Sequence, residues 1–207
     1  MGETKKRTYN SKNRENQAKH TKSRILQSAK ELFQNEGFDR VTIQQLAQAA
    51  DVSMPTIYAI FKSKRGVLQS LIDEALPQDE FSDLVQESMN ELSAKKRLAK
   101  TARMARKIYD AERELMGILS NASLVAPEFK ELEYERETRR YARQGKFISF
   151  MMDNNHLSST LSLTKARDIL WTLTGRDIYR MFVIERGWTS QEYENWLEKT
   201  LIETLLS

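Results

Sequence analysis

Two closely spaced helix starts between residues 41 and 64 constrain the fold of this chain more than any other feature. Thr42 is followed three residues later by Gln45, the pattern of a capping box, in which each side chain binds the backbone N–H of the other residue. Ser53 is a second N-cap residue, and Pro55 lies in the first turn after it, where a missing N–H costs little. Two helices joined by a short turn form a helix-turn-helix unit, whose second helix enters the major groove of DNA.

The neighbouring segments complete a small helical domain. Residues 21–36 have apolar side chains at helical spacing and are followed by Gly37, a residue typical of helix C′ positions. The apolar face consists of Ile25, Ala29, Leu32 and Phe33. A further helix is expected over residues 64–75, because Pro77 cannot continue it.

Positive charge is concentrated in this part of the chain. Residues 1–66 hold 13 Lys and Arg against 6 Asp and Glu, whereas the remainder holds 20 against 23. Because the N-terminal part is basic and the remainder is slightly acidic, we expect only the N-terminal part to contact a polyanion. Residues 1–20 lack apolar spacing, so we expect a flexible basic arm, which either binds DNA phosphates and a minor groove or is only a solubilising tail.

Residues 21–76 resemble the DNA-binding domain of the TetR (tetracycline-repressor-like) family of bacterial transcriptional regulators. The positions that carry the resemblance are Ala29, Leu32, Phe33, Gly37, Thr42, Ile43, Ala47, Ala50, Val52, Ser53, Thr56, Ile57, Tyr58, Phe61, Lys64 and Leu68. The family usually has Gly in the turn between the two helices. This chain has Asp51 there, which tolerates a left-handed backbone better than most residues do.

The resemblance implies a DNA contact surface on the two helices. Its residues are Thr42, Gln44, Ser53, Met54, Pro55, Thr56, Tyr58, Lys62 and Lys64. Hydroxyl groups, helix N-termini and Lys64 would hold phosphates. Met54 and Pro55 offer no side-chain hydrogen-bond donors. We therefore expect base reading to depend on thymine-methyl contacts, Gln44 and Thr56.

Residues 77–207 are expected to form a second, larger helical domain, so the fold class is all-α. The apolar patterns predict helices over residues 77–93, 94–120, 127–153 and 164–186. A last helix follows the capping box formed by Thr189 and Glu192. The expected divisions are a basic arm over 1–20, a DNA-binding domain over 21–76 and an effector-binding and dimerisation domain over 77–207.

The last two predicted helices are too apolar to be covered by one small domain. Their sequence also resembles the C-terminal ends of TetR-like regulators, which pair with a second subunit in a four-helix bundle. The resemblance implies a homodimer interface formed by Ile178, Phe182, Tyr193, Trp196, Leu197, Leu201 and Leu205. Arg176 and Asp177 stand out in an apolar segment, and we favour ion pairs across this interface over polar anchors in a pocket.

The second domain in this family commonly binds a small effector among its helices. The candidate pocket residues are Met104, Ile108, Tyr109, Met116, Phe147, Met151, Trp171 and Thr174. The alternative is that this stripe of Met and aromatic residues is ordinary core, which is the more frequent role of such a stripe.

Other function classes find little support in the sequence. The chain lacks Cys, so a disulfide framework and a cysteine-based metal site are excluded, and a reducing cytoplasm is the expected location. His20 and His156 lie outside any metal-binding spacing, and no Gly-rich phosphate loop, GxSxG or HExxH motif occurs. We expect no enzyme activity, metal, cofactor, secretory signal or membrane span.

Together these patterns predict an all-helical homodimeric regulator of transcription, a repressor, that binds a palindromic operator with two recognition helices about 34–36 Å apart. A small-molecule effector in the second domain would change that spacing through the helix that connects the domains. Two alternatives remain. One is a DNA-binding regulator controlled by a protein partner or by its abundance, and the other is an interaction protein that uses the motif only as a structural unit.

Overall fold

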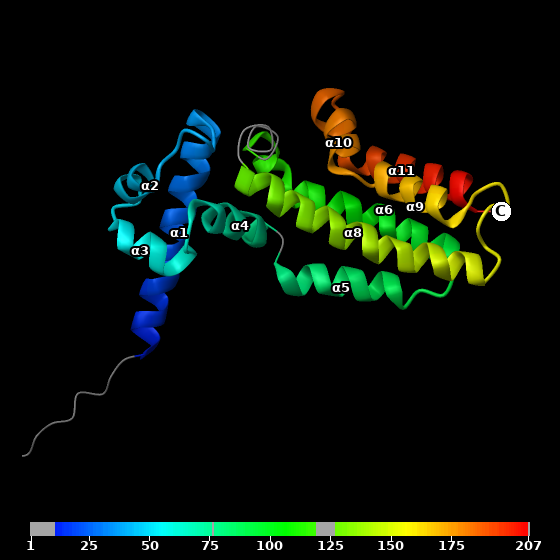
Figure 1. The fold of residues 1–207 in the computed structure, drawn as a ribbon, viewed down its shortest axis with the longest axis horizontal. Coiled ribbons are helices and arrows are strands. Elements are labelled where there is room, and N and C mark those ends of the chain that lie inside the picture. Colours follow the sequence, from blue (N-terminus) through cyan, green and yellow to red (C-terminus); the bar gives the residue numbers. More distant parts are fainter. Residues whose placement is uncertain (1–10, 76, 119–126, 207) are drawn as a thin grey trace, which may run out of the picture. The chain divides into compact units, whose positions relative to one another are not determined.

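The computed structural model describes residues 11–75, 77–118 and 127–206, and this part of the chain is all-α, as the sequence predicts (Figure 1). It contains no strand, only a single antiparallel bridge between Leu157 and Leu206. No helix in it is long and apolar enough to cross a membrane. The chain divides into two compact units between Leu71 and Ile72, inside helix α4 (Lys64–Ala75). The domain boundary at 76/77 stays a prediction.

The first unit contains α1 (Ser11–Glu36), α2 (Ile43–Ala49), α3 (Met54–Phe61) and the larger part of α4. Since α1 begins at Ser11, the flexible arm predicted over 1–20 is wrong for residues 11–20, and residues 1–10 lie outside the described part. Extending an existing helix avoids the cost of nucleation. The added turns also carry a salt bridge of 3.1 Å between Glu15 and Lys19, in the favourable i,i+4 order.

The core of the first unit is formed by the apolar faces of its helices. The buried residues include Ile25, Leu26, Ala29, Phe33, Phe38, Leu46, Ala50, Ile57, Phe61 and Leu68. Gly37 ends α1 with a left-handed φ of 88°, which confirms its predicted role. Helix α3 has only eight residues and is held by this packing, because a helix of that length is not stable alone.

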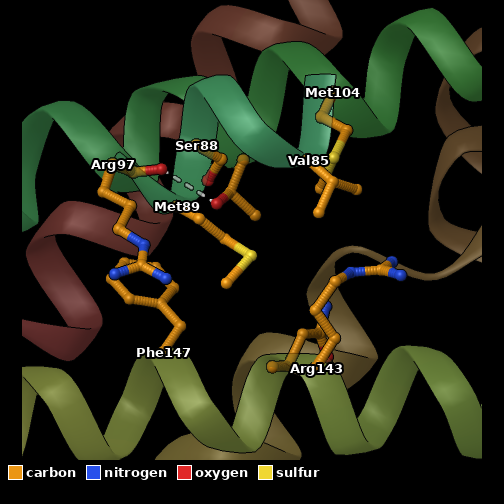
Figure 2. Close-up of a pocket in the computed structure, with 9 residues that line it drawn as sticks. Val85, Ser88, Met89, Arg97, Met104, Arg143 and Phe147 are labelled. Carbon is orange, nitrogen blue, oxygen red and sulfur yellow. Dashed lines mark hydrogen bonds between the residues drawn. The ribbon is translucent and has the colours of Figure 1, made fainter. Parts of the chain in front are cut away.

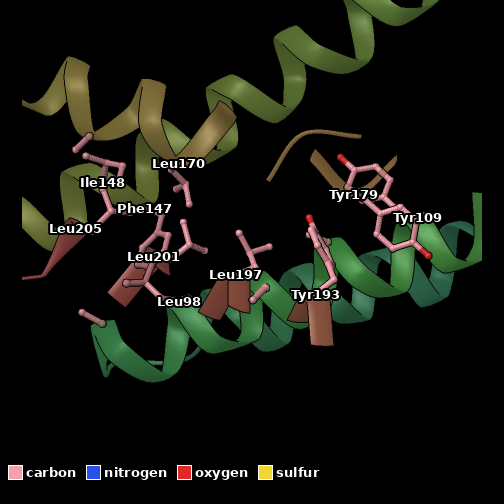
Figure 3. Packing of buried hydrophobic residues seen from close by; sticks show 14 of the residues in the cluster. Leu98, Tyr109, Phe147, Ile148, Leu170, Tyr179, Tyr193, Leu197, Leu201 and Leu205 are labelled. Carbon is pink, nitrogen blue, oxygen red and sulfur yellow. The ribbon is translucent and has the colours of Figure 1, made fainter. Parts of the chain in front are cut away.

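The second unit contains α5 (Gln78–Met89), α6 (Ala94–Glu112), α8 (Pro127–Asp153), α9 (Leu163–Leu173), α10 (Arg176–Tyr179) and α11 (Ser190–Leu205). A 3₁₀ turn, η1 (Arg113–Leu115), follows α6, and a π-helical segment, η2 (Arg180–Glu185), follows α10. Helix α11 packs along α6, and α9 packs along α8 (Figure 1). Figure 3 shows the resulting core, in which Leu98, Ile148 and Leu201 are fully buried.

Three predicted helices of the second unit differ from the structure. The helix predicted over 77–93 ends at Met89, and the one predicted over 94–120 is interrupted after Glu112 by η1, beyond which residues 116–118 are helical again. Residues 119 and 120 lie outside the described part. The helix predicted over 164–186 is divided, because Gly175 is extended, with φ −78° and ψ 154°. The hydroxyl of Thr174 donates to the Leu170 carbonyl at 2.6 Å, a local bond that competes with helix continuation.

Candidate nucleic-acid interface and interior cavity

The start of α2 has the geometry of the predicted capping box. The backbone N–H of Gln45 donates to Thr42 Oγ1 at 3.2 Å, and the backbone N–H of Thr42 donates to Gln45 Oε1 at 2.8 Å. Gln45 Nε2 also donates to Glu36 Oε2 at 3.1 Å, which ties α2 to the end of α1. Thr42 and Gln44 are exposed, so the cap fixes their position and leaves them accessible.

The turn between α2 and α3 requires one left-handed residue. Asp51 supplies it, with a φ of 49°, in the position where the family usually has Gly. The carbonyl of Asp51 accepts a hydrogen bond from Arg24 Nη2 at 3.2 Å, so α1 holds the turn. Ser53 then caps α3, because its Oγ accepts from the backbone N–H of Thr56 at 3.3 Å. These contacts fix the angle at which α3 is presented.

Helix α3 has one buried face and one open face. Ile57 and Phe61 are 0% and 5% exposed and belong to the core. Met54 and Tyr58 are 45% and 50% exposed. Tyr58 is thus accessible, as its predicted DNA contact requires. Among the other residues of the predicted contact surface, Gln44, Ser53, Pro55 and Lys62 are exposed, and Thr56 is half-buried.

Lys64 has a structural role that the sequence did not reveal. Its Nζ donates to the carbonyls of Phe38, Asp39 and Val41 at 2.7, 3.2 and 2.9 Å. It also lies 4.5 Å from the centre of the Phe38 ring. An ammonium group has three N–H donors, and these carbonyls use all of them. In this geometry the side chain fastens the loop before α2 to α4, and the phosphate contact predicted for Lys64 stays a prediction that these bonds disfavour.

Two residues that position this surface were not predicted. Arg24 was missed because nothing in the sequence indicates that α1 passes beside the turn. Gly66 lets α4 begin directly after α3, since a Cβ there would overlap the carbonyl of Phe61. A glycine in the first turn of a predicted helix is unfavourable by propensity, and that mismatch was the available signal.

The second unit contains a cavity between α5, α6 and α8 (Figure 2). Its volume is about 30 Å³, which accommodates about one water molecule. The lining residues are Val85, Ser88, Met89, Arg97, Thr101, Met104, Arg143, Gln144 and Phe147. Met104 and Phe147 are the two that the sequence predicted. Met89 is 47% exposed, so the α5 side of the cavity borders solvent.

The six other predicted pocket residues lie in the core or at its edge. They are Ile108, Tyr109, Met116, Met151, Trp171 and Thr174. Tyr109 Oη donates to the Thr174 carbonyl at 2.9 Å, and burial raises the pKa of Tyr109 to about 12. For these residues the ordinary-core interpretation describes the structure better than the pocket interpretation.

Two arginines that line the cavity have no salt bridge within the described ranges. Arg97 is 8% exposed, its Nε has no hydrogen-bond partner there, and its guanidinium lies 4.3 Å from the centre of the Phe147 ring. Arg143 lies 5.2 Å from the centre of the Phe81 ring. Burial lowers the pKa of both guanidinium groups from the ordinary value, which reflects the cost of a charge that no carboxylate balances.

The most deeply buried carboxylate among the described residues of the second unit, by contrast, is paired within the chain. Glu112 is 1% exposed and binds Arg136 and Arg176. Arg176 also binds Glu133 at 2.7 Å. Although burial opposes it, the two carboxylates raise the pKa of Arg176. The ion pairs predicted for Arg176 across a dimer interface are thus wrong, because its guanidinium binds carboxylates of its own chain.

Four of the predicted dimer residues also belong to the core of their own chain. Tyr193, Leu197, Leu201 and Leu205 of α11 are fully buried (Figure 3). A partner subunit cannot contact them in this conformation, so their predicted interface role is wrong for this fold. The prediction failed because an apolar stripe does not distinguish burial within a subunit from burial between subunits.

The remaining predicted dimer residues contribute to an apolar surface of the second unit. Phe182 lies 4.5 Å from Trp196 and 4.4 Å from Trp188 between ring centres. Met181 and Ile184 of η2 are 40% and 47% exposed. We call this surface the outer aromatic patch, and it consists of Ile178, Met181, Phe182, Ile184, Trp188 and Trp196.

Comparison with known proteins agrees with the geometry of the first unit. Residues 25–71 match the family model described as bacterial regulatory proteins, tetR family. The chain is 37% identical over 54 residues to the probable HTH-type transcriptional regulator YttP of Bacillus subtilis, and the match covers 26% of each chain. The matched part of the chain thus spans about a quarter of the length of this curated relative.

Solved structures extend the similarity to the fold of both units at low sequence identity. FadR from Bacillus subtilis, in complex with stearoyl-CoA, has a TM-score of 0.69 at 16% identity and matches over 87% of this chain and 97% of its own. A putative transcriptional regulator from Saccharomonospora viridis, in complex with choline, has a TM-score of 0.62 at 18% identity. This match covers 91% of the present chain and 99% of the regulator.

Proposed function

We propose that this chain, which belongs to the tetR family of bacterial regulatory proteins, binds a palindromic operator as a homodimer and represses transcription until a small-molecule effector binds its second unit. The observation that carries the DNA-binding role is the open face of α3. Met54 and Tyr58 are about half exposed there, while Ile57 and Phe61 anchor the opposite face in the core. A short helix held rigidly with accessible side chains suits insertion into a major groove.

The exposed groups divide into those that position the protein and those that read bases. The capped helix starts at Thr42 and Ser53 and the hydroxyl of Tyr58 bind phosphates and set the register on the duplex. Gln44 donates to base edges, and Met54 packs against thymine methyl groups. Lys62, which is exposed, adds a phosphate contact.

Binding to duplex DNA at several salt concentrations tests this role. The logarithm of the binding constant should fall linearly with the logarithm of the salt concentration, with a slope of about −0.9 for each phosphate contact. Selection from random duplexes should return a palindrome, and Gln44→Ala should change the preferred bases. If no duplex retains the protein at low salt, the DNA-binding role is refuted and the interaction-protein alternative is favoured.

The outer aromatic patch is the proposed homodimer surface, because several large apolar side chains are gathered there and partly exposed. The Phe182→Glu variant should have half the mass of the wild type by light scattering, keep its helical circular dichroism and lose operator affinity. Leu92→Glu is the matched control, since Leu92 is 79% exposed and lies outside the patch. A dimer that persists in Phe182→Glu would exclude the patch as the interface.

The effector role is supported by the connection between the units. Helix α4 spans their division, so a movement of α4 changes how the first unit is held. A ligand causes such a movement only if it binds the two arrangements with different affinity. The two solved structures named above contain an anionic and a cationic ligand, so they support an effector site without indicating its chemistry.

A second candidate function is a DNA-binding regulator controlled by a protein partner or by its abundance. The observation that favours it is the size of the cavity, since about 30 Å³ admits no organic effector unless the surrounding helices move. Release of a bound operator by a small molecule decides between the two candidates.

A further inference from the structure

The interior of the second unit contains positive charge that its described residues do not neutralise. Arg97 and Arg143 line the cavity from α6 and α8, and the described ranges contain no salt bridge to either. A buried charge without a partner is costly, and chains normally pair it, as Glu112 is paired here with Arg136. The two cavity arginines therefore do not contribute to the stability of the fold in the way that paired buried charges do.

The contacts of Arg97 orient its unused donors. Its guanidinium stacks on Phe147 and Phe150, with 4.3 and 5.1 Å to the ring centres. Stacking fixes the plane of the group and covers its faces, but it leaves the N–H donors at its edge available. Nε is one of these donors and has no partner among the described residues. Figure 2 shows Arg97 and Arg143 on either side of the Met89 side chain.

Besides the arginines, the cavity lining combines the polar side chains of Ser88, Thr101 and Gln144 with an apolar, adaptable part. Val85 and Met89 come from α5, and Met104 comes from α6. Methionine side chains are flexible and adjust to apolar groups of different shape. Because Met89 is 47% exposed, the α5 side offers a route by which an apolar chain reaches solvent.

We propose that the cavity recognises an amphipathic organic acid, with its carboxylate or phosphate head group bound by Arg97 and Arg143 and its apolar chain along Val85, Met89 and Met104. The proposal rests on the proposed function in treating this cavity as the effector site. Guanidinium groups bind carboxylates and phosphates through paired, charge-assisted hydrogen bonds. The present volume holds about one water molecule, so entry of the ligand requires α5 to move, and α5 directly follows α4 in the sequence.

Titration calorimetry of the full chain with four ligands of equal chain length tests the head-group chemistry. Decanoate and decyl phosphate, below their critical micelle concentrations, represent the two acidic head groups, and decanol and decylamine represent a neutral and a cationic one. At least one acid should bind, and the alcohol and the amine should bind at least about tenfold more weakly, since charged hydrogen bonds are lost.

Matched arginine variants test the residues. Arg97→Met and Arg143→Met should each weaken binding of the acid at least about tenfold. Arg103→Met should bind it as the wild type does, because Arg103 is an exposed arginine on the same helix as Arg97. Without ligand, Arg97→Met should melt at the same temperature as the wild type or higher, since it removes an unpaired buried cation. If Arg97→Met does not fold, the ligand series and Arg143→Met still decide.

The proposal is overturned if neither acid binds, if decanol or decylamine binds as tightly as the acids, or if both Met variants bind the acid like the wild type. Binding to duplex DNA is measured on the same preparations. Acid binding without duplex binding would refute the proposed function and leave this inference standing. Duplex binding without acid binding would refute this inference alone.

Discussion

Replacing Lys64 with Met removes three hydrogen bonds while keeping most of the apolar stem of the side chain. The bonds to the carbonyls of Phe38 and Val41, at 2.7 and 2.9 Å, are partly buried. The bond to Asp39 is exposed, and water replaces it at little cost. With about 1.5 kcal/mol for each partly buried charged bond and about 0.5 kcal/mol for the contact with the Phe38 ring, the free energy of unfolding should fall by about 3.5 kcal/mol.

Urea denaturation combined with native-state hydrogen exchange measures this loss. Exchange at the backbone amides of α2 and α3 reports on the first unit by itself, which is necessary because two units need not unfold together. Lys62→Met is the matched control. Lys62 is exposed, and the one hydrogen bond of its Nζ that is described goes to the Ala59 carbonyl at 3.2 Å. Its loss should change the free energy of unfolding by less than about 0.5 kcal/mol.

In DNA binding the order of the two effects should be reversed, so that Lys62→Met has the larger effect and Lys64→Met the smaller. At a temperature where both are folded, Lys62→Met should reduce the steepness of the salt dependence by about 0.9, because one phosphate contact is lost. Lys64→Met should leave the steepness unchanged. If Lys64→Met instead reduced it by about 0.9 without loss of stability, Lys64 would bind a phosphate and its assignment to the loop would be refuted.

Three other substitutions test local features of the fold. Asp51→Ala should lower the free energy of unfolding by about 1 kcal/mol, because Ala tolerates a φ of 49° less well, and urea denaturation beside Asp51→Gly measures it. Gly66→Ala should lower the melting temperature by circular dichroism, through a loss of more than about 2 kcal/mol, because the new Cβ overlaps a backbone carbonyl. Although burial opposes it, hydrogen bonds from Ser190 and Tyr179 hold the pKa of Asp110 below its ordinary value of 3.8. The stability that Asp110 contributes is thus present at neutral pH and lost as the pH falls through that lowered pKa. The urea midpoints of Asp110→Asn should therefore differ most from those of the wild type at neutral pH and converge with them as the pH falls below that pKa.

The first unit was predictable because its main signals are local. The capping residues Thr42 and Ser53, the C′ residue Gly37 and the left-handed Asp51 each act through neighbours within a few positions, and all four have the predicted geometry. The bonds of Lys64 are different, because they depend on where a loop more than 20 residues earlier passes in space. The sequence shows a lysine at a helix start and does not show which acceptors surround it.

The second unit was harder to predict because its sites depend on contacts between distant helices. Its helices could be located, but the apolar stripe of α11 that includes Leu197 and Leu201 was assigned to a partner subunit, whereas it covers α6 of the same chain. Arg176 was assigned to the same interface for the same reason, although its carboxylates are Glu112 and Glu133. Periodicity identifies which side chains must be buried, and it does not identify what buries them.

Helix geometry places Arg97 on the inward face of α6, although arginine is a residue type that is usually exposed. It lies three residues after Ala94 and four before Thr101, both of which are buried on α6, so position 97 belongs to the inward face of that helix. Only the general rarity of buried arginine argued against this placement. A charged residue at an inward position has two explanations. Either the chain supplies the opposite charge, as Arg136 does for Glu112, or a ligand supplies it. Arg97 has no salt bridge within the described ranges, so a carboxylate of the chain does not explain its burial. A ligand that supplies the negative charge does explain it, and the acid-binding experiment decides between the two explanations.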